Sequence, residues 1–257
     1  MEHQVKLIAL GTGNSFTEEL WYSNFVFIHG ERYLFVDCPP YLPKMLREHR
    51  DRLGDPRLSV SNYREVIPTH NHEDHVAGVE EVGYFAIRQP PERRPILYGT
   101  RENLAKLWEG SLRAGLELRV DAQGRPLPLT FADYFKTVEL GPLNDLGGGL
   151  RLETRLNTHQ PPTIALKFIV GEHRLGYSSD TGFDPGLIEW LSDCRFVIHE
   201  VHFNPDVAFH TDIRRLRELP ADLQRRIHLI HYGDDFRQHD PSPMRFLEQG
   251  RVYFPFA

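Results

Sequence analysis

The feature that most constrains this chain is a run of metal-binding side-chain types, His70-Asn71-His72-Glu73-Asp74-His75. The run follows a short apolar stretch, residues 65–68, that is typical of a buried strand, and it precedes a segment with helical spacing, residues 76–87. Residues two apart on an extended segment point to the same side, so His70 and His72 can hold one ion together. The last two residues of the run begin the helix and can reach a second ion. Because imidazole and carboxylate groups are zinc ligands, the run predicts a metal site rather than a polar loop.

The rest of the chain predicts an α/β fold. Helical spacing appears at residues 41–52, 76–87, 101–118, 185–191 and 212–219, the last with Thr211 as its expected N-cap, and residues 121–128 and 140–150 are expected to be loops. Strands are expected at residues 5–10, 25–28, 33–36, 65–68, 96–98, 150–156, 163–170, 174–178, 196–200, 227–231 and 251–254. Strand-rich halves flank a helical middle, which favours two mixed sheets packed face to face with helices on the outer faces. We expect one domain over residues 1–257 with a helical insertion at about 100–136.

Composition excludes several other classes of protein. The chain has 257 residues, a formal net charge of −6 and two cysteines, Cys38 and Cys194. The negative charge argues against a general nucleic-acid binder, which usually carries a basic footprint. Two distant cysteines make no disulfide framework and favour a reducing compartment, so we expect a cytoplasmic protein. Residues 1–10 lack a basic region followed by an apolar core, so no signal peptide is expected, and no apolar run is long enough to span a membrane.

The histidine run resembles the His-x-His-x-Asp-His motif of the metallo-β-lactamase superfamily, and the resemblance extends over nearly the whole chain. The later motifs of that superfamily match His159, Asp180 and His231, in the same order and each near the end of an expected strand. The resemblance implies an αββα sandwich with a dinuclear site on one edge. His70, His72 and His159 would hold one ion, Asp74, His75 and His231 would hold the other, and Asp180 would bridge them.

The resemblance also indicates which metal and which chemistry to expect. Two divalent ions are implied, with zinc expected and manganese an alternative. The redox di-iron branch of the superfamily has a glutamate where this chain has His72, which favours hydrolysis over electron transfer. Asp37 matches an aspartate that lies beneath the histidine loop. It would orient a ligand imidazole, or it would simply form a turn.

Two further motifs resemble the ribonuclease Z branch and its phosphodiesterase relatives. Val197-Ile198-His199-Glu200 matches the His-Glu motif, and Phe209-His210-Thr211 matches the His-Ser/Thr motif. By this resemblance His210 reaches the scissile phosphate, where it stabilises charge or protonates the leaving oxygen, and Glu200 orients it. The alternative is an unrelated surface histidine and a paired glutamate. His202 could also take the place of His210 if the motif were misaligned.

The implied activity is hydrolysis of a small phosphodiester, with a cyclic nucleotide as the expected substrate and a metal-bridging hydroxide as the attacking group. The 20 residues between His159 and Asp180 hold two expected strands, so the RNA-gripping arm of transfer-RNA-processing members does not fit there. A ribonuclease Z-type transfer-RNA 3′-processing endonuclease is the alternative, followed by a lactone or thioester hydrolase and by a non-catalytic scaffold. Relatives are often homodimers. The aromatic residues of the helical insertion are expected in the core rather than stacked on a base: Trp108, Phe131, Tyr134 and Phe135.

Overall fold

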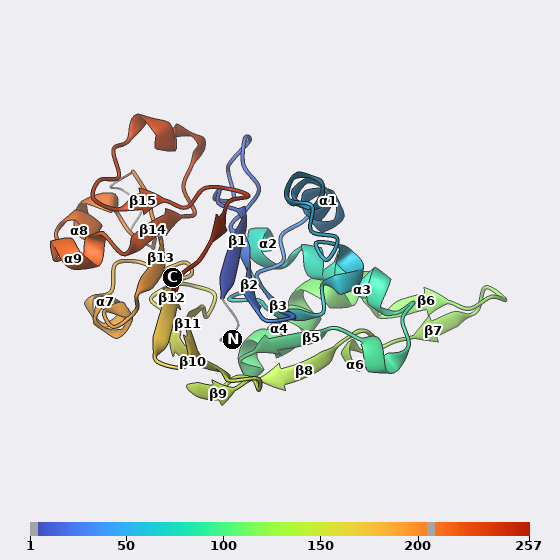
Figure 1. Ribbon diagram of the computed structural model, residues 1–257. Helices are drawn as coiled ribbons and strands as arrows, with labels where there is room; N and C mark the ends of the chain where they lie inside the picture. Colours follow the sequence, from blue (N-terminus) through green and yellow to red (C-terminus); the bar gives the residue numbers. More distant parts are fainter. Residues whose placement is uncertain (1–4, 205–208) are drawn as a thin grey trace. The chain divides into compact units, whose positions relative to one another are not determined.

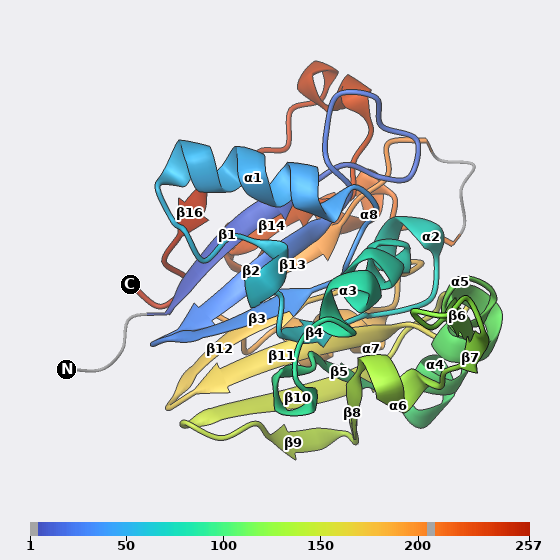
Figure 2. The same cartoon turned by 90° about the vertical axis from the view of Figure 1, so that its right-hand side faces the viewer.

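The computed structural model describes residues 5–204 and 209–257 (Figures 1 and 2). Residues 1–4, which begin the segment where no signal peptide is expected, lie outside the described part. The chain divides into two compact units, the first made of residues 1–32 and 141–257 and the second of residues 33–140. None of the helices in the described ranges is long and apolar enough to cross a membrane.

The first unit contains a mixed sheet with the strand order β15-β14-β13-β12-β11-β10-β9. Pairing is antiparallel from β9 to β12 and parallel from β12 to β15. An antiparallel group, β16-β1-β2, belongs to the same unit. The strands are β1 (Lys6–Gly11), β2 (Asn24–His29), β9 (Leu143–Asp145), β10 (Leu150–Leu156), β11 (Ile164–Val170), β12 (His173–Tyr177), β13 (Phe196–Glu200), β14 (Ile227–Ile230), β15 (Arg245–Phe246) and β16 (Val252–Tyr253).

Aromatic side chains join these two groups of strands face to face. Phe27 of β2 stacks on Phe168 of β11 with 4.6 Å between ring centroids, and Phe25 meets Tyr177 of β12 edge-on at 5.1 Å. All four rings are almost completely buried. Each fully buried ring of this kind stabilises the fold by roughly 1.5–3 kcal/mol, so this aromatic layer stabilises the face-to-face packing that the sequence predicts.

Helices cover the opposite face of the mixed sheet of the first unit. They are α7 (Pro185–Leu191), α8 (Ile213–Arg217) and α9 (Ala221–Gln224), and Figure 1 shows them across that sheet from β1 and β2. Leu191 of α7 and Leu216 of α8 pack in one apolar cluster with Val197 and Leu229 of the sheet. This sheet therefore has strands on one face and helices on the other, as a sandwich with outer helices requires.

The second unit contains the parallel strands β3 (Arg32–Val36), β4 (Glu65–Ile67), β5 (Ile96–Gly99) and β8 (Lys136–Glu139). A short 3₁₀ turn, η4 (Asp234–Gln238), lies in the first unit, and η1 (Val60–Asn62) and η2 (Pro91–Arg93) lie in the second. The remaining elements of the second unit are α1 (Leu42–Leu53), α2 (Glu73–Val76), α3 (Gly78–Ala86), α4 (Arg101–Lys106), the π-helical turn η3 (Leu107–Leu112), α5 (Arg113–Leu116), α6 (Phe131–Tyr134) and the hairpin β6 (Leu118–Val120)–β7 (Pro126–Pro128).

The expected helical insertion differs from the structure in several places. Of residues 101–118, residues 101–116 form α4, η3 and α5 in succession, and Leu118 begins strand β6. Residues 121–128, expected as a loop, contain the turn of the β6–β7 hairpin and strand β7. Helix α6 lies within the expected helical insertion, whereas β9 lies in a segment expected as a loop and the short strands β8 and β15 have no expected counterpart. The expectation that the insertion's aromatic residues are core holds for Tyr134 and Phe135, whereas Trp108 and Phe131 are half-buried and stacked on each other at 5.4 Å.

The expected N-cap of the helix at 212–219 is also wrong. Asp212 caps α8, and its side chain accepts a hydrogen bond from the backbone N–H of Arg214. Thr211 is buried, and its hydroxyl donates instead to the carbonyl of Thr181 at 2.9 Å. Most other expected elements are present with boundaries shifted by a few residues.

Candidate metal centre

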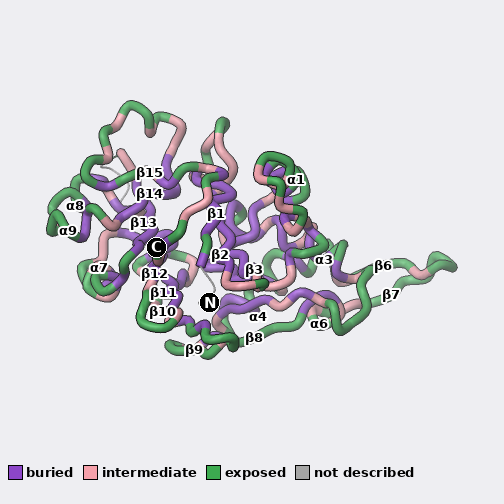
Figure 3. The backbone as a smooth tube through the Cα atoms, in the orientation of Figure 1, coloured by how far each residue is buried: buried purple, intermediate pink, exposed green. Residues whose placement is uncertain are grey.

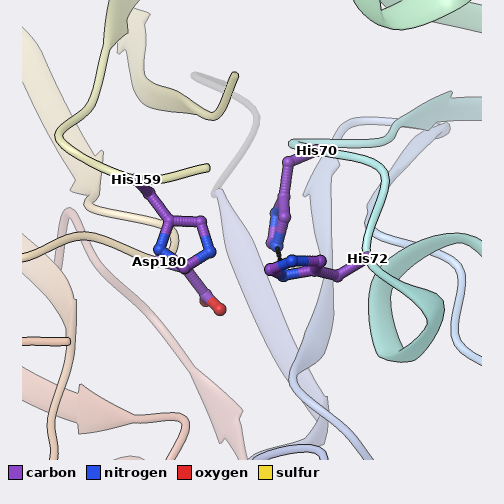
Figure 4. A group of neighbouring side chains, drawn as sticks. All are labelled: His70, His72, His159 and Asp180. Atoms are coloured by element: carbon purple, nitrogen blue, oxygen red, sulfur yellow. Dashed lines mark hydrogen bonds between the residues drawn. The ribbon is translucent and has the colours of Figure 1, made fainter. Parts of the chain in front are cut away.

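Four histidine and aspartate side chains of the second unit gather between β4 and α2. His70 and His72 lie in the loop after β4, and Asp74 and His75 lie in the first turn of α2. His70, Asp74 and His75 are buried, and His72 is half-buried. Nε2 of His70 and Nδ1 of His72 are 3.0 Å apart, and the dashed line in Figure 4 marks this contact. Nε2 of His75 lies 3.4 Å from Oδ2 of Asp74. In each pair, two potential metal-ligand atoms are close enough to bind the same ion.

Asp37 fixes the orientation of this histidine loop. Its Oδ2 lies 2.9 Å from Nδ1 of His75, and its Oδ1 accepts hydrogen bonds from the backbone N–H of Thr69 at 2.7 Å and from the Thr69 hydroxyl at 2.9 Å. Burial raises the pKa of the Asp37 carboxyl, and the neighbouring His75 opposes that shift. Of the two interpretations of Asp37, a turn former or an orienting partner, these contacts favour the second. A proton held on Nδ1 of His75 leaves Nε2 as the ligand atom.

The backbone holds the same region tightly. The backbone N–H of Cys38 donates to the carbonyl of His75 at 2.7 Å, and the N–H of Gly78 donates to the carbonyl of Cys38 at 2.9 Å. A Cβ atom on Gly78 would lie 2.1 Å from the carbonyl oxygen of Pro39. Glycine is therefore required where α3 begins, because any side chain would push the histidine-bearing helix α2 away from the segment after β3.

The first unit supplies three further candidate ligands from three loops. His159 follows β10, Asp180 follows β12 and His231 follows β14, and all three are buried. Nδ1 of His159 lies 3.1 Å from the carbonyl oxygen of Phe209, and Nε2 of His231 lies 3.3 Å from Oδ2 of Asp180. Figure 4 draws His159 and Asp180 on their loops. As expected from the sequence, each of these residues stands just after a strand.

Left-handed backbone conformations accompany these positions. Asp37, Ser179 and His231 have φ values of 63°, 51° and 62°, and each directly follows a strand or lies one residue before a candidate ligand. Non-glycine residues in this conformation cost of order 1–3 kcal/mol each and persist where the surrounding structure holds them in place. The three strained residues all lie at strand ends beside candidate ligands. The fold therefore tolerates an unfavourable backbone conformation at positions where it directs these side chains toward the site.

A glutamate–histidine pair lies beside Asp180 and His231. Oε1 of Glu200, the last residue of β13, is 3.1 Å from Nδ1 of His210 and accepts backbone hydrogen bonds from Thr181 at 2.8 Å and Thr211 at 3.2 Å. Glu200 is completely buried, and burial, followed by the nearby Asp180, raises the pKa of its carboxyl.

His210 is close to the candidate ligands of its own unit. One ligand atom each of Asp180, His210 and His231 lie within 4.8 Å of one another, and the ring centroids of His210 and His231 are 5.1 Å apart. His202, the other histidine considered for this place, bonds to Asn204 instead. His199 is fully buried and holds the carbonyl of Glu200 at 2.7 Å, and burial lowers its pKa to about 4, so it is an uncharged core residue.

The donor atoms fit divalent metal ions. Two ligands about 2.05 Å from a tetrahedral zinc ion are about 3.3 Å apart. The pairs His70–His72, Asp74–His75 and Asp180–His231 have separations of 3.0, 3.4 and 3.3 Å. Imidazole and carboxylate donors also suit zinc, manganese and iron better than they suit calcium.

Sequence reasoning missed two residues that support this centre. The Phe209 carbonyl orients His159, and Thr69 connects Asp37 to the histidine loop, its hydroxyl lying 3.1 Å from Nδ1 of His70. Thr69 was detectable because it directly precedes the histidine run. A backbone carbonyl leaves no mark on the sequence, so the role of Phe209 could not be anticipated.

Solved structures identify the fold. The fold matches the metallo-β-lactamase fold protein YhfI from Bacillus subtilis with a TM-score of 0.72, at 17% identity and covering 97% of this chain and 99% of that one. It also matches human tRNase Z, short form, with a TM-score of 0.68, at 16% identity and covering 96% and 98%. The predicted fold class is confirmed, because the chain has the metallo-β-lactamase fold.

Sequence relatives then define the family. The profile of the anti-Pycsar protein Apyc1 family matches residues 5–253. Anti-Pycsar protein Apyc1 of Paenibacillus sp. (strain J14) is 31% identical over 254 residues, covering 97% of this chain and 98% of that protein. The protein of the same name from Saccharibacillus brassicae is 30% identical, covering 97% and 99%, and that of Bacillus phage 010DV004 is 29% identical, covering 98% and 99%. The chain belongs to the anti-Pycsar protein Apyc1 family.

Proposed function

We propose that this protein is a dinuclear metal-dependent phosphodiesterase that hydrolyses a cyclic nucleotide. The observation that carries the proposal is the Glu200–His210 pair beside Asp180 and His231. A lactone or thioester hydrolase needs the metal ligands alone, whereas a phosphodiesterase needs a group that neutralises charge on the phosphoryl or leaving oxygen.

In this proposal the ligands of the two units combine. His70, His72 and His159 hold one ion, Asp74, His75 and His231 hold the other, and Asp180 bridges them. When bound, a pair of divalent ions supplies Lewis acidity and lowers the pKa of coordinated water. Zinc is the metal we expect, with manganese as the alternative. With only two carboxylates among seven ligands, the loaded site is positively charged and attracts an anionic phosphodiester.

His210 has the position and the support of a catalytic acid. Nδ1 faces Glu200, so Nε2 is the ring nitrogen that would act on the substrate, and the buried carboxylate favours a proton on the imidazole. Glu200 cannot turn away, because two backbone N–H groups hold the same oxygen. His210 would protonate the departing oxygen or stabilise the charge on the phosphoryl group, and Glu200 would act as its positioning residue.

Two observations favour a small nucleotide over RNA. Strands β11 and β12 occupy the interval between His159 and Asp180, where the RNA-gripping arm of transfer-RNA-processing relatives would lie. The ring of Phe209 is 61% exposed and 5.1 Å from that of His210, so it offers a flat surface for a base beside the proposed acid. The relatives carry the name anti-Pycsar protein, and a cyclic nucleotide is the phosphodiester we associate with it.

The cellular setting belongs to the same proposal. Cys38 and Cys194 are free and buried, and burial raises the pKa of both thiols, Cys194 to about 12. Buried unlinked thiols suit a reducing compartment, so we place the enzyme in the cytoplasm.

We also propose that the protein is a homodimer. Three apolar side chains of the β6–β7 hairpin are exposed, Leu118 by 59%, Val120 by 66% and Leu127 by 44%, and Figure 3 shows both strands as exposed. An isolated two-stranded hairpin is marginally stable in water, so packing against a second copy would stabilise it. Light scattering should give twice the chain mass, and Val120→Lys combined with Leu127→Lys should give a monomer.

Hydrolysis assays test the activity. Protein purified with zinc or manganese should hydrolyse bis(p-nitrophenyl) phosphate and at least one cyclic mononucleotide or dinucleotide. His210→Ala should lower kcat by about 10²–10⁴-fold, the usual contribution of general acid catalysis. His239→Ala, which changes a histidine near the surface of the same unit, is the matched control.

The same panel separates the alternatives. Cleavage of a precursor transfer RNA at a defined 3′ position, without hydrolysis of cyclic nucleotides, would favour a ribonuclease Z-type endonuclease. Faster turnover of lactones or thioesters than of phosphodiesters would favour a lactone or thioester hydrolase. Unchanged phosphodiester turnover in His210→Ala would reject the proposed role of that residue.

A further inference from the structure

A concave site lies at the end of the first unit's mixed sheet opposite to the Glu200–His210 pair. It has a volume of about 780 Å³ and is lined at the starts of three parallel strands, by Phe196 of β13, His228 of β14 and Arg245 of β15. The proposed acid pair is at the opposite ends, because Glu200 is the last residue of β13. Four residues of strand separate Phe196 from Glu200 by about 13 Å, so this hollow is distinct from the metal centre.

The lining of the hollow is strongly basic. Five arginines and one glutamate line it, on a chain whose formal net charge is −6. Three of the arginines are engaged by the protein: Arg226 by the carbonyls of Ser192 and Cys194, Arg195 by the carbonyl of Ala257, and Arg251 by Glu248.

The other two arginines, Arg225 and Arg245, are exposed, and neither side chain makes a hydrogen bond or an ion pair with a residue in the described ranges. Guanidinium groups are weakly hydrated and present paired donors that match phosphate oxygens. Two of them in one hollow, whose lining contains one side-chain carboxylate, that of Glu248 paired with Arg251, therefore favour a phosphate-bearing anion.

Aromatic rings form another wall of the same hollow. Phe196 stacks on His228 with 3.9 Å between centroids and 11° between planes, and Tyr253 meets Phe196 edge-on at 5.8 Å. Burial lowers the pKa of His228 to about 4, so its ring is uncharged at neutral pH. Phe254 lines the hollow with 45% of its surface exposed. Volumes of 300–1,000 Å³ with apolar rings and a few charged groups are typical of small-molecule sites.

We propose that this hollow binds a nucleoside phosphate, with Arg225 and Arg245 contacting the phosphates and the aromatic wall contacting the base. A simple inorganic anion would use the arginines alone and leave the rings without a role. A ligand held here is too far from His210 to be the molecule hydrolysed, so the site adds a second nucleotide-binding position to the protein.

Calorimetric titration of the metal-loaded protein with ADP and with pyrophosphate tests this inference. We expect ADP to occupy a site whose affinity falls at least tenfold in the double variant Arg225→Ala/Arg245→Ala. Arg88→Ala/Arg93→Ala, which removes the same charge from exposed positions of the second unit, should leave that affinity unchanged. Pyrophosphate should bind at least tenfold more weakly than ADP.

The outcomes are distinguishable from failure of the proposed phosphodiesterase activity. Hydrolysis of bis(p-nitrophenyl) phosphate by Arg225→Ala/Arg245→Ala should stay within twofold of the parent rate, and a parallel loss would place the arginines in the catalytic site and overturn the second site. Absence of an arginine-dependent ADP site, or an equal loss in the control variant, would also overturn it. Equal affinity for pyrophosphate and ADP would refute the nucleoside as the ligand. If the protein hydrolyses no phosphodiester, the ADP titration still decides the inference.

Discussion

Replacing Asp37 with asparagine should weaken metal binding while leaving the fold intact. In the structure one carboxylate oxygen holds both donors of Thr69, and the other faces Nδ1 of His75 at 2.9 Å. Asparagine can keep the Thr69 contacts through its carbonyl oxygen, but it then presents an NH₂ group to His75. The histidine can accept that hydrogen bond only through an unprotonated Nδ1, which moves its proton to Nε2, the atom required for the metal.

The size of the effect follows from these contacts. Losing the partner that orients a ligand imidazole lowers metal affinity by about 10–100-fold, or about 1.4–2.7 kcal/mol. The free energy of unfolding without metal should change less, by about 1 kcal/mol, because the pKa of Asp37 is raised by burial and a neutral side chain avoids that cost of desolvation. Asp37→Ala should cost about 2–4 kcal/mol, since it leaves three buried donors without their acceptor.

Competition with a chromophoric chelator measures the metal affinity, and urea unfolding in EDTA measures the metal-free stability. Asp55→Asn is the matched control, because Asp55 also accepts a hydrogen bond from a backbone N–H in the second unit, that of Arg57, but does not touch the histidine loop. If Asp37→Asn bound both metal equivalents as tightly as the parent protein, the orienting role of Asp37 would be refuted.

Three further predictions concern the first unit. Glu200→Gln keeps acceptors for the backbone N–H groups but removes the charge facing His210, so kcat should fall about tenfold or more with KM nearly unchanged; a change in KM alone would contradict the positioning role. Phe209→Ala should raise KM for a cyclic nucleotide but not for bis(p-nitrophenyl) phosphate, and Phe209→Trp should restore it; equal effects on both substrates would count against base stacking. Asp184 caps α7 and pairs with Arg155 at 2.7 Å, so Asp184→Ala should cost about 1 kcal/mol in urea unfolding at pH 7. Burial raises the pKa of the Asp184 carboxyl, but these contacts lower it by more. The stabilisation by Asp184 is therefore present above pH about 4, and it should disappear as the pH falls through the lowered pKa of the folded protein. A stability difference between parent and Asp184→Ala that persists at pH 2 would count against this role.

The spacing of the run from His70 to His75 marked it as a candidate metal site, whereas His159, Asp180 and His231 were indicated by the family resemblance. Each candidate ligand lies next to an apolar segment that forms a strand, so the ends of β4, β10, β12 and β14 could be located by hydrophobic pattern. The contact between Glu200 and His210 was expected from the resemblance of their two motifs to the ribonuclease Z branch, and the structure contains it. Hydrophobic pattern could locate the strand ends, but it could not by itself select which polar residue at each end belongs to the site.

The elements that were missed depend on contacts distant in sequence. Strands β6, β7 and β15 have three, three and two residues, too few for an alternating pattern to be recognised. Thr211 and Asp212 are both good N-caps, and only the distant Thr181 carbonyl, which takes the Thr211 hydroxyl, decides between them. Distant contacts also determine which aromatic residues of the insertion are buried. Tyr134 and Phe135 are covered by neighbouring elements, whereas Trp108 and Phe131 are only half-buried.

Anomalous X-ray diffraction from crystals of the zinc-loaded protein, recorded on both sides of the zinc absorption edge, tests the central claim most directly. We predict two zinc peaks about 3.5–4 Å apart, one within bonding distance of His70, His72 and His159, the other of Asp74, His75 and His231, and both of Asp180. A single peak, or zinc bound away from these seven side chains, would contradict the dinuclear site on which the proposed activity depends.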